Sequence, residues 1–276
     1  MHNKSWMARL MAAPHVVWSV LFILAPLAFV FYYAFTDKTG AFTLNNVKEL
    51  GSANYLDIFT RSLCFALAAT AICLLVAYPL AYAISRAKPR SQKICIMLTM
   101  LPMWMNFLIR TYSIMAILED TGFLNSLLGR IGLPPLHIIN TGGAVIFGMV
   151  YNYLPYMILP LYTVLSKLDN RLLEASADLG CTPTQTFFKV VMPLSRSGVV
   201  SGVTMVFVPS VSTFYISQKL GGGKFQLIGD VIERQFQSAY NYNLGAAMSL
   251  VLMVLILLSL AVMNRYSDEG EGGLVA

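Results

Sequence analysis

Six apolar stretches, each long enough to cross a lipid bilayer, constrain this chain more than any other feature. A membrane-spanning helix needs about 20 predominantly apolar residues at a rise of about 1.5 Å per residue. Such stretches occur at Pro14–Phe35, Ser62–Ile84, Ile94–Leu118, Gly142–Leu165, Gly198–Ile216 and Gly245–Met263. None of them shows the period-two alternation of a half-buried strand. We therefore predict an all-α integral membrane protein with six transmembrane helices.

The composition agrees with a membrane environment. Of the 276 residues, 57% are hydrophobic and only 12% are charged, whereas an ordinary soluble domain has about 25% charged residues. The formal net charge is +6, but the basic residues are spread between the apolar stretches. They therefore indicate the flanks of membrane spans rather than a nucleic-acid surface. We expect the lipid bilayer as a partner of this chain and no nucleic acid.

The basic residues also predict the orientation. The short connection Ser85–Lys93 contains four basic residues and no acidic one, which is typical of a cytoplasmic loop. Alternation along six spans then places both termini and the connection Ser166–Ser197 in the cytoplasm. The remaining three connections lie outside: Thr36–Arg61, Glu119–Thr141 and Ser217–Asn243.

Three further features refine this single transmembrane domain, which we assign to residues 1–266. Six prolines within the first five spans predict kinked helices: Pro26, Pro79, Pro102, Pro155, Pro160 and Pro209. The outer stretch Gly122–Leu133 is apolar but too short to span, so we expect a helix in the membrane interface or on the mouth of the bundle. The acidic, glycine-rich tail Ser267–Ala276 is expected to be disordered.

The sequence contains no pattern typical of a catalytic or metal site. Its three histidines are scattered, and the nearest approach to a phosphate-binding loop, Gly221–Phe225, has the wrong spacing. We therefore do not expect an enzyme, and ATP would have to be handled by another subunit. The six spans contain no Asp or Glu, which disfavours a carrier driven by an ion gradient.

The cytoplasmic connection Leu168–Pro193 contains two helix starts and one sharp stop. Asp169 or Asn170 can cap a short helix, and Gly180 stands where a left-handed residue would end it. The string Thr182-Pro183-Thr184-Gln185 then has the residues of a capping box, with proline at the first helical position. We predict two short amphipathic helices that form a rigid projection. The residues alone leave an ordinary interfacial loop as an equal alternative.

This connection resembles the signature of the permease subunits of ABC importers, EAA-xxx-G-x9-I-x-LP. The match consists of Glu174-Ala175-Ser176, Gly180 and Val190-Val191-Met192-Pro193, where Ser176, Val190 and Met192 are conservative departures. The resemblance implies a MetI-like permease fold in which the projection is a coupling region that docks on an ATPase subunit. It also implies the residues that take part: Glu174, Ala175, Ser176, Asp178, Gly180 and Pro193.

Four longer strings resemble the PotB-type permeases of spermidine/putrescine importers: Leu101–Tyr112, Tyr151–Tyr162, Lys167–Gly180 and Leu220–Phe236. This resemblance implies a multi-pass subunit of the bacterial cytoplasmic (inner) membrane. It implies three protein partners, namely an ABC ATPase dimer, a second related permease and an extracellular polyamine-binding protein. ATP and Mg²⁺ would then bind to the ATPase, and this chain would bind no cofactor.

A polyamine is a chain of ammonium groups on methylene segments, so its path should offer aromatic faces and carboxylates. The aromatic candidates lie in spans three to five: Trp104, Tyr112, Tyr153, Tyr156, Phe214 and Tyr215. The acidic candidates lie only at the outer rim: Glu119, Asp120, Asp230 and Glu233. Any single aromatic residue is also explained by packing or by the lipid interface. We therefore expect a weak passage, with affinity supplied mainly by the binding protein.

Arg110 is the one charged residue within a predicted span. Together with Asn106 and Ser113 it would share one face of a helix, which predicts a polar stripe toward the bundle. Because a cation repels a polyamine, we expect a structural or gating role for Arg110 and Asn106 rather than contact with the substrate.

The sequence leaves three other functions open. A permease of the same family could carry another solute, such as iron, sulfate or thiamine. A carrier driven by an ion gradient is disfavoured by the missing carboxylates, and a membrane scaffold is disfavoured by the spacing of the motif at Glu174 and Gly180.

Overall fold

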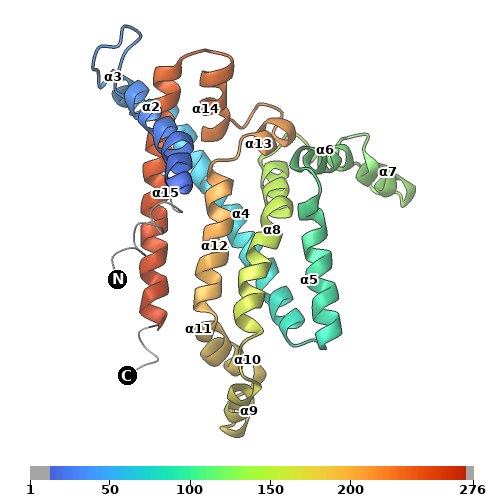
Figure 1. Ribbon diagram of the computed structural model, residues 1–276. Helices are drawn as coiled ribbons and strands as arrows, with labels where there is room; N and C mark the ends of the chain where they lie inside the picture. Colours follow the sequence, from blue (N-terminus) through green and yellow to red (C-terminus); the bar gives the residue numbers. More distant parts are fainter. Residues whose placement is uncertain (1–12, 272–276) are drawn as a thin grey trace, which may run out of the picture. The chain divides into compact units, whose positions relative to one another are not determined.

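Helices form nearly all the regular structure of this chain in a computed structural model that describes residues 13–271 (Figure 1). An isolated β-bridge joins Thr36 to Phe42. Within the described range, four helices are long and apolar enough to cross a membrane, or six if each of two bent helix pairs counts as one span. The prediction of an all-α membrane protein is therefore confirmed.

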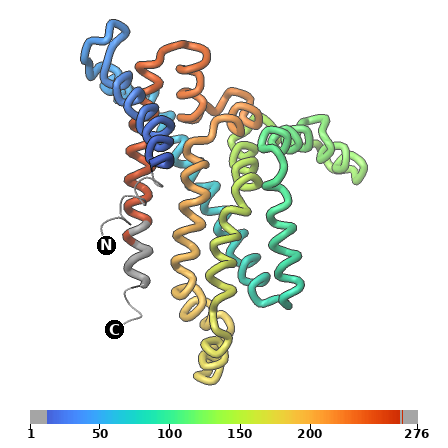
Figure 2. Tube along the Cα trace, in the orientation of Figure 1, coloured from blue at the N-terminus to red at the C-terminus, as the bar shows by residue number. Residues whose placement is uncertain are grey.

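The chain divides into two compact units. The first contains the described residues up to 57 together with 231–255, and the second contains residues 58–230 together with the described residues from 256 onward. Figure 2 traces the path of the chain through both. The helix α4 (Ala53–Ser85) begins in the first unit and continues into the second, and α15 (Tyr242–Glu271) does the same.

In the second unit, α5, α8 and α12 run side by side, with short helices at each end (Figure 1). The elements of the bundle are α5 (Pro89–Trp104), α8 (Gly142–Leu165) and α12 (Arg196–Val211). One end carries α6 (Phe107–Leu118), α7 (Phe123–Arg130) and α13 (Tyr215–Leu220). The other end carries α9 (Asn170–Asp178), α10 (Pro183–Thr186), the π-helical η2 (Phe187–Val191) and α11 (Met192–Leu194). The helix α14 (Ile228–Gln237) starts in this unit and ends in the first.

The core of the second unit forms where α12 packs closely on α8. Two glycines four residues apart, Gly198 and Gly202, make this approach possible. A Cβ atom at Gly198 would lie 3.1 Å from the Pro160 carbonyl oxygen, and one at Gly202 would lie 2.6 Å from Met157 Sδ. We call this contact the glycine seam. Around it, buried side chains of α8 fill the interior: Met149, Met157, Ile158, Leu161 and Leu165.

Buried polar side chains in these helices bond to their own backbone. The hydroxyls of Thr70 and Ser210 donate to the carbonyls of Ala66 and Val206, and the Asn152 amide donates to the Gly148 carbonyl at 2.9 Å. Because lipid offers no hydrogen-bond partners, such internal bonds are the ordinary way to keep a polar residue in an apolar helix.

A π-helical segment precedes a proline at two places. The segment η1 (Val20–Leu24) lies two residues before Pro26, and η2 ends two residues before Pro193. A proline has no N–H and its ring collides with the carbonyl four residues earlier. The wider π turn contains that carbonyl in both cases, so it accommodates the proline without ending the helix.

Two predicted spans are broken in the structure. The third, expected to be continuous over Ile94–Leu118, is interrupted at Met105–Asn106, where the pair of helices bends by 94°. The fifth, expected over Gly198–Ile216, ends at Val211 and is followed by the separate helix α13 from Tyr215. A bend of 67° precedes it at Ser195, between Pro183–Leu194 and Arg196–Val211. The first, fourth and sixth spans agree with the helices Ala13–Ala34, Gly142–Leu165 and Tyr242–Met263 to within a few residues.

The remaining boundaries differ in smaller ways. The helix α4 begins at Ala53, nine residues before the expected start of the second span. The apolar outer stretch contains the short helix α7, as predicted. The helix α15 continues to Glu271, so the first part of the tail for which disorder was expected is helical, while residues 272–276 lie outside the described range, as do residues 1–12 at the other end.

The first unit is organised around a loop that follows the helix Ala13–Ala34, which ends in α2 (Ala25–Ala34). The Asn243 amide donates to the Thr36 carbonyl at 2.7 Å, and Asn46, in α3 (Asn45–Glu49), donates to the same oxygen at 2.9 Å. In the loop, the Thr39 hydroxyl and the backbone N–H groups of Thr39 and Ala41 donate to Asp37, and these bonds lower the pKa of its carboxyl.

Candidate functional site

The projection predicted from the sequence is present at one end of the second unit. The Asp169 side chain caps α9 by accepting a hydrogen bond from the Arg171 N–H at 3.0 Å. At the other end of α9, Gly180 has φ +79°. The Cys181 N–H bonds to the Ser176 carbonyl and the Gly180 N–H to the Ala177 carbonyl. These two bonds form a Schellman motif, which requires the left-handed glycine.

The second helix of the projection starts with the predicted capping box. The Gln185 N–H donates to Thr182 Oγ1 at 3.3 Å, and the Thr182 N–H donates to Gln185 Oε1 at 2.9 Å. Pro183 occupies the first turn, as expected. The helix then continues through η2 and α11, up to Leu194.

Within this projection the residues of the signature divide into a buried one and several exposed ones. Ser176 is buried, and its hydroxyl lies 2.7 Å from Thr186 Oγ1. The exposed ones are Glu174, Ala175, Asp178, Gly180 and Pro193. Leu179 is 85% exposed, and the carboxylates of Glu174 and Asp178 are exposed on the same short segment, so the projection presents both apolar and acidic groups. Such a surface is suited to docking on another protein.

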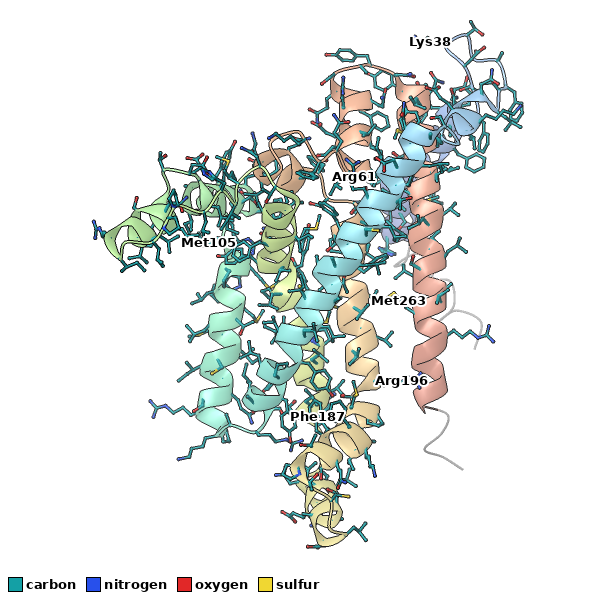
Figure 3. All side chains as sticks on the ribbon, turned by 180° about the vertical axis from the view of Figure 1, so that it is seen from behind. Lys38, Arg61, Met105, Phe187, Arg196 and Met263 are labelled. Carbon is teal, nitrogen blue, oxygen red and sulfur yellow. The ribbon has the colours of Figure 1, made fainter. Side chains whose placement is uncertain are left out.

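The projection is held against the bundle by aromatic rings and hydrogen bonds. The Phe187 ring contacts Tyr78 and Tyr82 edge to face, with centroids 5.3 and 5.7 Å apart, and Figure 3 shows Phe187 at this end. The Tyr78 hydroxyl bonds to the Ser195 hydroxyl at the bend before α12. These contacts join the projection to α4 and to the residue that precedes α12.

The basic connection between α4 and α5 lies at the same end. Arg86 donates a hydrogen bond to the Asn170 side chain at the start of α9, and its guanidinium carbon lies 5.6 Å from the centroid of the Tyr82 ring. The two connections that the sequence places on one side of the membrane are therefore neighbours. Nothing in the local sequence marks Arg86 for this contact, because the contact depends on the tertiary arrangement.

At the opposite end, Asn106 lies in the break between α5 and α6, next to Met105 (Figure 3), whereas Arg110 and Ser113 of the expected stripe lie within α6. The Asn106 side chain caps α6 by accepting from the Leu108 N–H at 2.8 Å. Arg110 is 5% exposed, and it donates to the Pro102 carbonyl at 3.0 Å. The stripe along one continuous helix is therefore wrong, because Asn106 lies ahead of α6 and Arg110 bonds back across the break.

The structure separates the aromatic candidates into distinct groups. Tyr112 and Tyr215 contact each other edge to face, with ring centroids 5.9 Å apart. Tyr153 is buried and its ring lies 6.4 Å from that of Tyr156. Phe214 is 42% exposed at the residue before α13.

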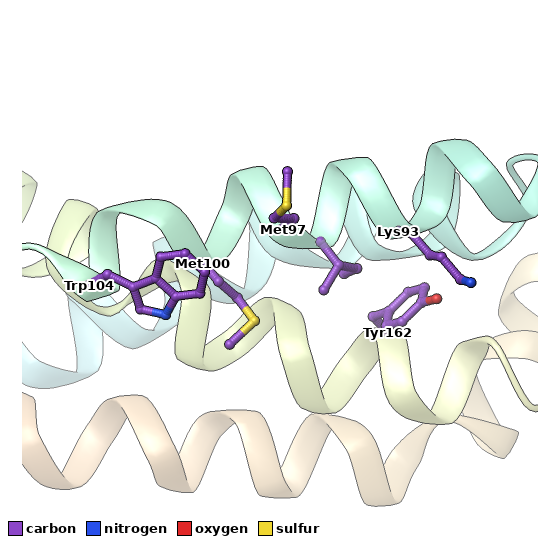
Figure 4. A pocket seen from close by; sticks show the side chains of 6 residues that line it. Lys93, Met97, Met100, Trp104 and Tyr162 are labelled. Carbon is purple, nitrogen blue, oxygen red and sulfur yellow. The ribbon is translucent and has the colours of Figure 1, made fainter.

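Trp104 belongs to a different place, a groove of about 330 Å³ between α5 and α8 (Figure 4). The lining residues are Lys93, Ile96, Met97, Met100, Trp104 and Tyr162. Trp104 is 72% exposed. The six aromatic candidates therefore do not form one continuous lining within this chain.

The acidic candidates differ in exposure. Glu119 and Asp120 are exposed, and Asp120 Oδ1 lies 3.0 Å from His137 Nδ1. Asp230 is buried, where it accepts hydrogen bonds from the Ser217 hydroxyl at 2.9 Å and the Leu227 N–H at 2.7 Å. Asp230 therefore fixes the loop before α14 rather than lining an open rim. Glu233 belongs to the first unit and is partly exposed.

Lys219 is a further residue of this region, and it was not among the residues predicted from the sequence. Its ammonium nitrogen lies 5.4 Å from the centroid of the Tyr112 ring and 5.7 Å from that of Tyr215. The four-residue spacing of Tyr215 and Lys219 is a signal that the sequence did contain, since residues so spaced share one face of a helix.

Comparison with known proteins identifies the family. Residues 5–269 match the model of the family "Binding-protein-dependent transport system inner membrane component". The spermidine/putrescine transport system permease protein PotB of Haemophilus influenzae is 39% identical, over 90% of each chain. PotB of Escherichia coli is 37% identical, over 91% of this chain and 94% of the relative.

The fold is also found in a solved structure. A subunit of a bacterial alginate ABC transporter, crystallised with an alginate-bound periplasmic protein, superposes with a TM-score of 0.82 at 15% identity. The match covers 97% of this chain and 96% of that one. The ABC permease fold, several apolar helices and the family match agree on a multi-pass protein of the bacterial inner membrane. This chain belongs to the family of inner membrane components of binding-protein-dependent transport systems.

Proposed function

We propose that this chain is the permease subunit of an ATP-driven importer of polyamines. The observation that carries the solute is the likeness to the spermidine/putrescine permeases of two bacteria at 37–39% identity over nine-tenths of the chain. The tyrosine pair Tyr112–Tyr215 supports it, because in this structure the two rings already hold an alkylammonium group.

The projection α9–α11 would dock on a separate ATPase. Its exposed Glu174 and Leu179 and its rigid Schellman turn support this role. In this proposal the projection and the Arg86 connection face the cytoplasm, as the basic residues predict. ATP and Mg²⁺ would bind to the ATPase dimer, and its closure would displace the projection and thereby the bundle.

The remaining partners follow from the same proposal. A second, related permease would complete the path, since the aromatic candidates of this chain do not line one by themselves. A polyamine-binding protein outside the membrane would deliver the solute. Weak contacts in the path are sufficient in that case, because conduction requires that a solute also leaves each site.

The solute is tested by uptake into vesicles that contain the complete complex. We expect ATP-dependent accumulation of labelled spermidine or putrescine when the loaded binding protein is supplied. Insensitivity to a protonophore would separate this importer from a gradient-driven carrier. Accumulation of iron, sulfate or thiamine in place of polyamines would contradict the proposed solute and leave the family unchanged.

The coupling role is tested at Glu174. Charge-assisted contacts at an interface are worth about 2–5 kcal/mol when one partner is truncated. We therefore expect Glu174→Ala to abolish uptake and to reduce co-purification of the ATPase, at normal membrane levels of the permease. Arg171→Ala on the same helix is the matched control, because Arg171 is exposed and lies outside the signature. Uptake by Glu174→Ala as high as that by Arg171→Ala would overturn the coupling role of Glu174.

A further inference from the structure

The ammonium of Lys219 is held by two tyrosine rings at the end of the second unit that carries α6 and α13. Its nitrogen lies within 6 Å of both ring centroids, the range in which the face of an aromatic ring attracts a cation. The rings of Tyr112 and Tyr215 stand at 85° to each other. The ring centroid of Phe107, on α6, lies 6.1 Å from that of Tyr215, on α13. Tyr112 and Tyr215 therefore form a site for an alkylammonium group, and the side chain of Lys219 occupies it in this structure.

The chemistry of the occupant matches the proposed solute. A lysine side chain is four methylene groups ending in an ammonium, which is also the structure of each end of putrescine. We propose that Tyr112 and Tyr215 bind the terminal ammonium of an incoming polyamine, and that Lys219 occupies this site as a tethered competitor until the solute displaces it. The substrate class in this inference rests on the proposed function.

The surroundings allow the side chain of Lys219 to leave while its backbone stays in place. In α13, Ile216 and Leu220 are fully buried, and the Ser217 hydroxyl donates to Asp230 at 2.9 Å. Tyr112 is 44% exposed, so the described part of this chain leaves its ring open to a ligand. The long lysine stem has four rotatable bonds and can swing away without unfolding the helix.

The strength of the site suits a transient step. Each cation–ring contact at a partly exposed position favours binding by about two- to fivefold, and neither tyrosine supplies a full negative charge. A tethered group acts at an effective concentration in the millimolar range, so Lys219 competes with free polyamine at similar concentrations. Free polyamine can bind only to the fraction of sites that Lys219 has left. The apparent affinity for polyamine is therefore the intrinsic affinity multiplied by that fraction.

The site is tested first without transport. In the complex with its native partners, the four cysteines of this chain, Cys64, Cys73, Cys95 and Cys181, are replaced and Lys219→Cys is introduced. The rate of modification is measured with cationic 2-aminoethyl methanethiosulfonate and with neutral methyl methanethiosulfonate. We expect the ratio of the two rates to be about five- to twentyfold higher than in a chain that also carries Tyr112→Leu and Tyr215→Leu.

Putrescine at constant ionic strength should slow the cationic reaction only where the tyrosines are present. If the double leucine variant does not assemble, Tyr112→Leu alone should lower the ratio by about two- to fivefold. Equal ratios with and without the tyrosines would overturn the site.

The competition is tested with a reporter outside the pair. Ile109 is 60% exposed and lies one turn before Tyr112, so the thiol of Ile109→Cys should be protected by putrescine bound nearby. We expect Lys219→Met to lower the half-protecting putrescine concentration about fivefold or more, and Lys219→Arg to leave it unchanged because a guanidinium also binds aromatic faces. Equal values for Lys219→Met and the parent would overturn the tethered competitor.

These results separate the inference from the proposed function. Positive binding tests in a complex that transports no polyamine would support the ammonium site and contradict the proposed solute. Polyamine uptake together with negative binding tests would support the proposed function and overturn the inference.

Discussion

The hydroxyl of Ser176 lies 2.7 Å from that of Thr186, and this contact joins the two short helices on either side of the Gly180 turn. Ser176 also donates to the Leu173 carbonyl of its own helix at 3.0 Å. Because Ser176 is buried and α9 and α10 meet at this point, the angle between the two helices depends on the small size of its side chain.

A first prediction concerns that size. Ser176→Ala removes both hydrogen bonds of the hydroxyl, each worth about 1 kcal/mol, but places no larger side chain between the helices. We therefore expect normal uptake and normal co-purification of the ATPase. Ser176→Leu forces extra methylene groups between α9 and α10 and should cost about 1–3 kcal/mol. Loss of ATPase co-purification from the leucine variant alone is the expected result. Wild-type behaviour of Ser176→Leu would show that the angle of the projection does not matter.

A second prediction separates backbone strain from bulk at Gly180. Nothing lies within 4 Å of a Cβ added there, but the residue has φ +79°. A β-branched side chain in this left-handed conformation costs about 1–2 kcal/mol per residue, whereas asparagine tolerates it. We expect Gly180→Val to reduce uptake and Gly180→Asn to retain most of it, at equal expression. A similar loss in both variants would indicate that contact with the partner, rather than strain, requires glycine.

A third prediction concerns two glycines of the outer connection. A Cβ at Gly222 would collide with the Asn140 side chain, while one at Gly223 meets nothing within 4 Å, and both residues have positive φ. Gly222→Ala should therefore distort this loop more than Gly223→Ala. The measurement is the ATP hydrolysis that the loaded binding protein stimulates. If the loop contacts that protein, stimulation should fall in Gly222→Ala and change less in Gly223→Ala. Basal hydrolysis should be unaffected in both variants. Equal stimulation in the two variants would contradict a docking role.

A fourth prediction concerns the orientation. Gln92 is a poor labelling position because its side chain donates to the carbonyls of Ser85 and Ala87. Ser91, on the basic connection, and Ser126, on α7, are exposed. In a chain without the native cysteines, an impermeant thiol reagent added to intact cells should label Ser126→Cys and not Ser91→Cys. The reverse pattern would invert the topology.

Local features were predictable where neighbouring residues alone determine them. The capping box at Thr182 and Gln185 and the left-handed Gly180 depend on bonds within five residues, and both were predicted correctly. The break at Met105–Asn106 was not, because the residues on both sides are apolar and continue the pattern of a span. Its signals were present, since Pro102 precedes it and Asn106 is a good helix cap.

Contacts between distant segments could not be predicted from the pattern of residues. Asp230 was expected at an open rim, but it is buried because it accepts from Ser217, thirteen residues earlier. The position of Lys219 over Tyr112 depends on how α13 lies on α6, and no periodicity of either helix determines that arrangement. For the same reason, Trp104 and Tyr112 were grouped by composition although the structure places them in different surroundings.

The glycine seam has a mechanical consequence. With backbones this close at Gly198 and Gly202, α8 and α12 cannot slide or tilt past each other without steric collision, so they behave as one stiff lever. The bend at Ser195, bonded to Tyr78, is where a push on the projection enters that lever. A small rotation there would be carried along α12 to Pro209, near its far end, where the carbonyl accepts a hydrogen bond from Tyr153 at the middle of α8. Force applied to the projection would therefore move α12 and the adjoining half of α8 together.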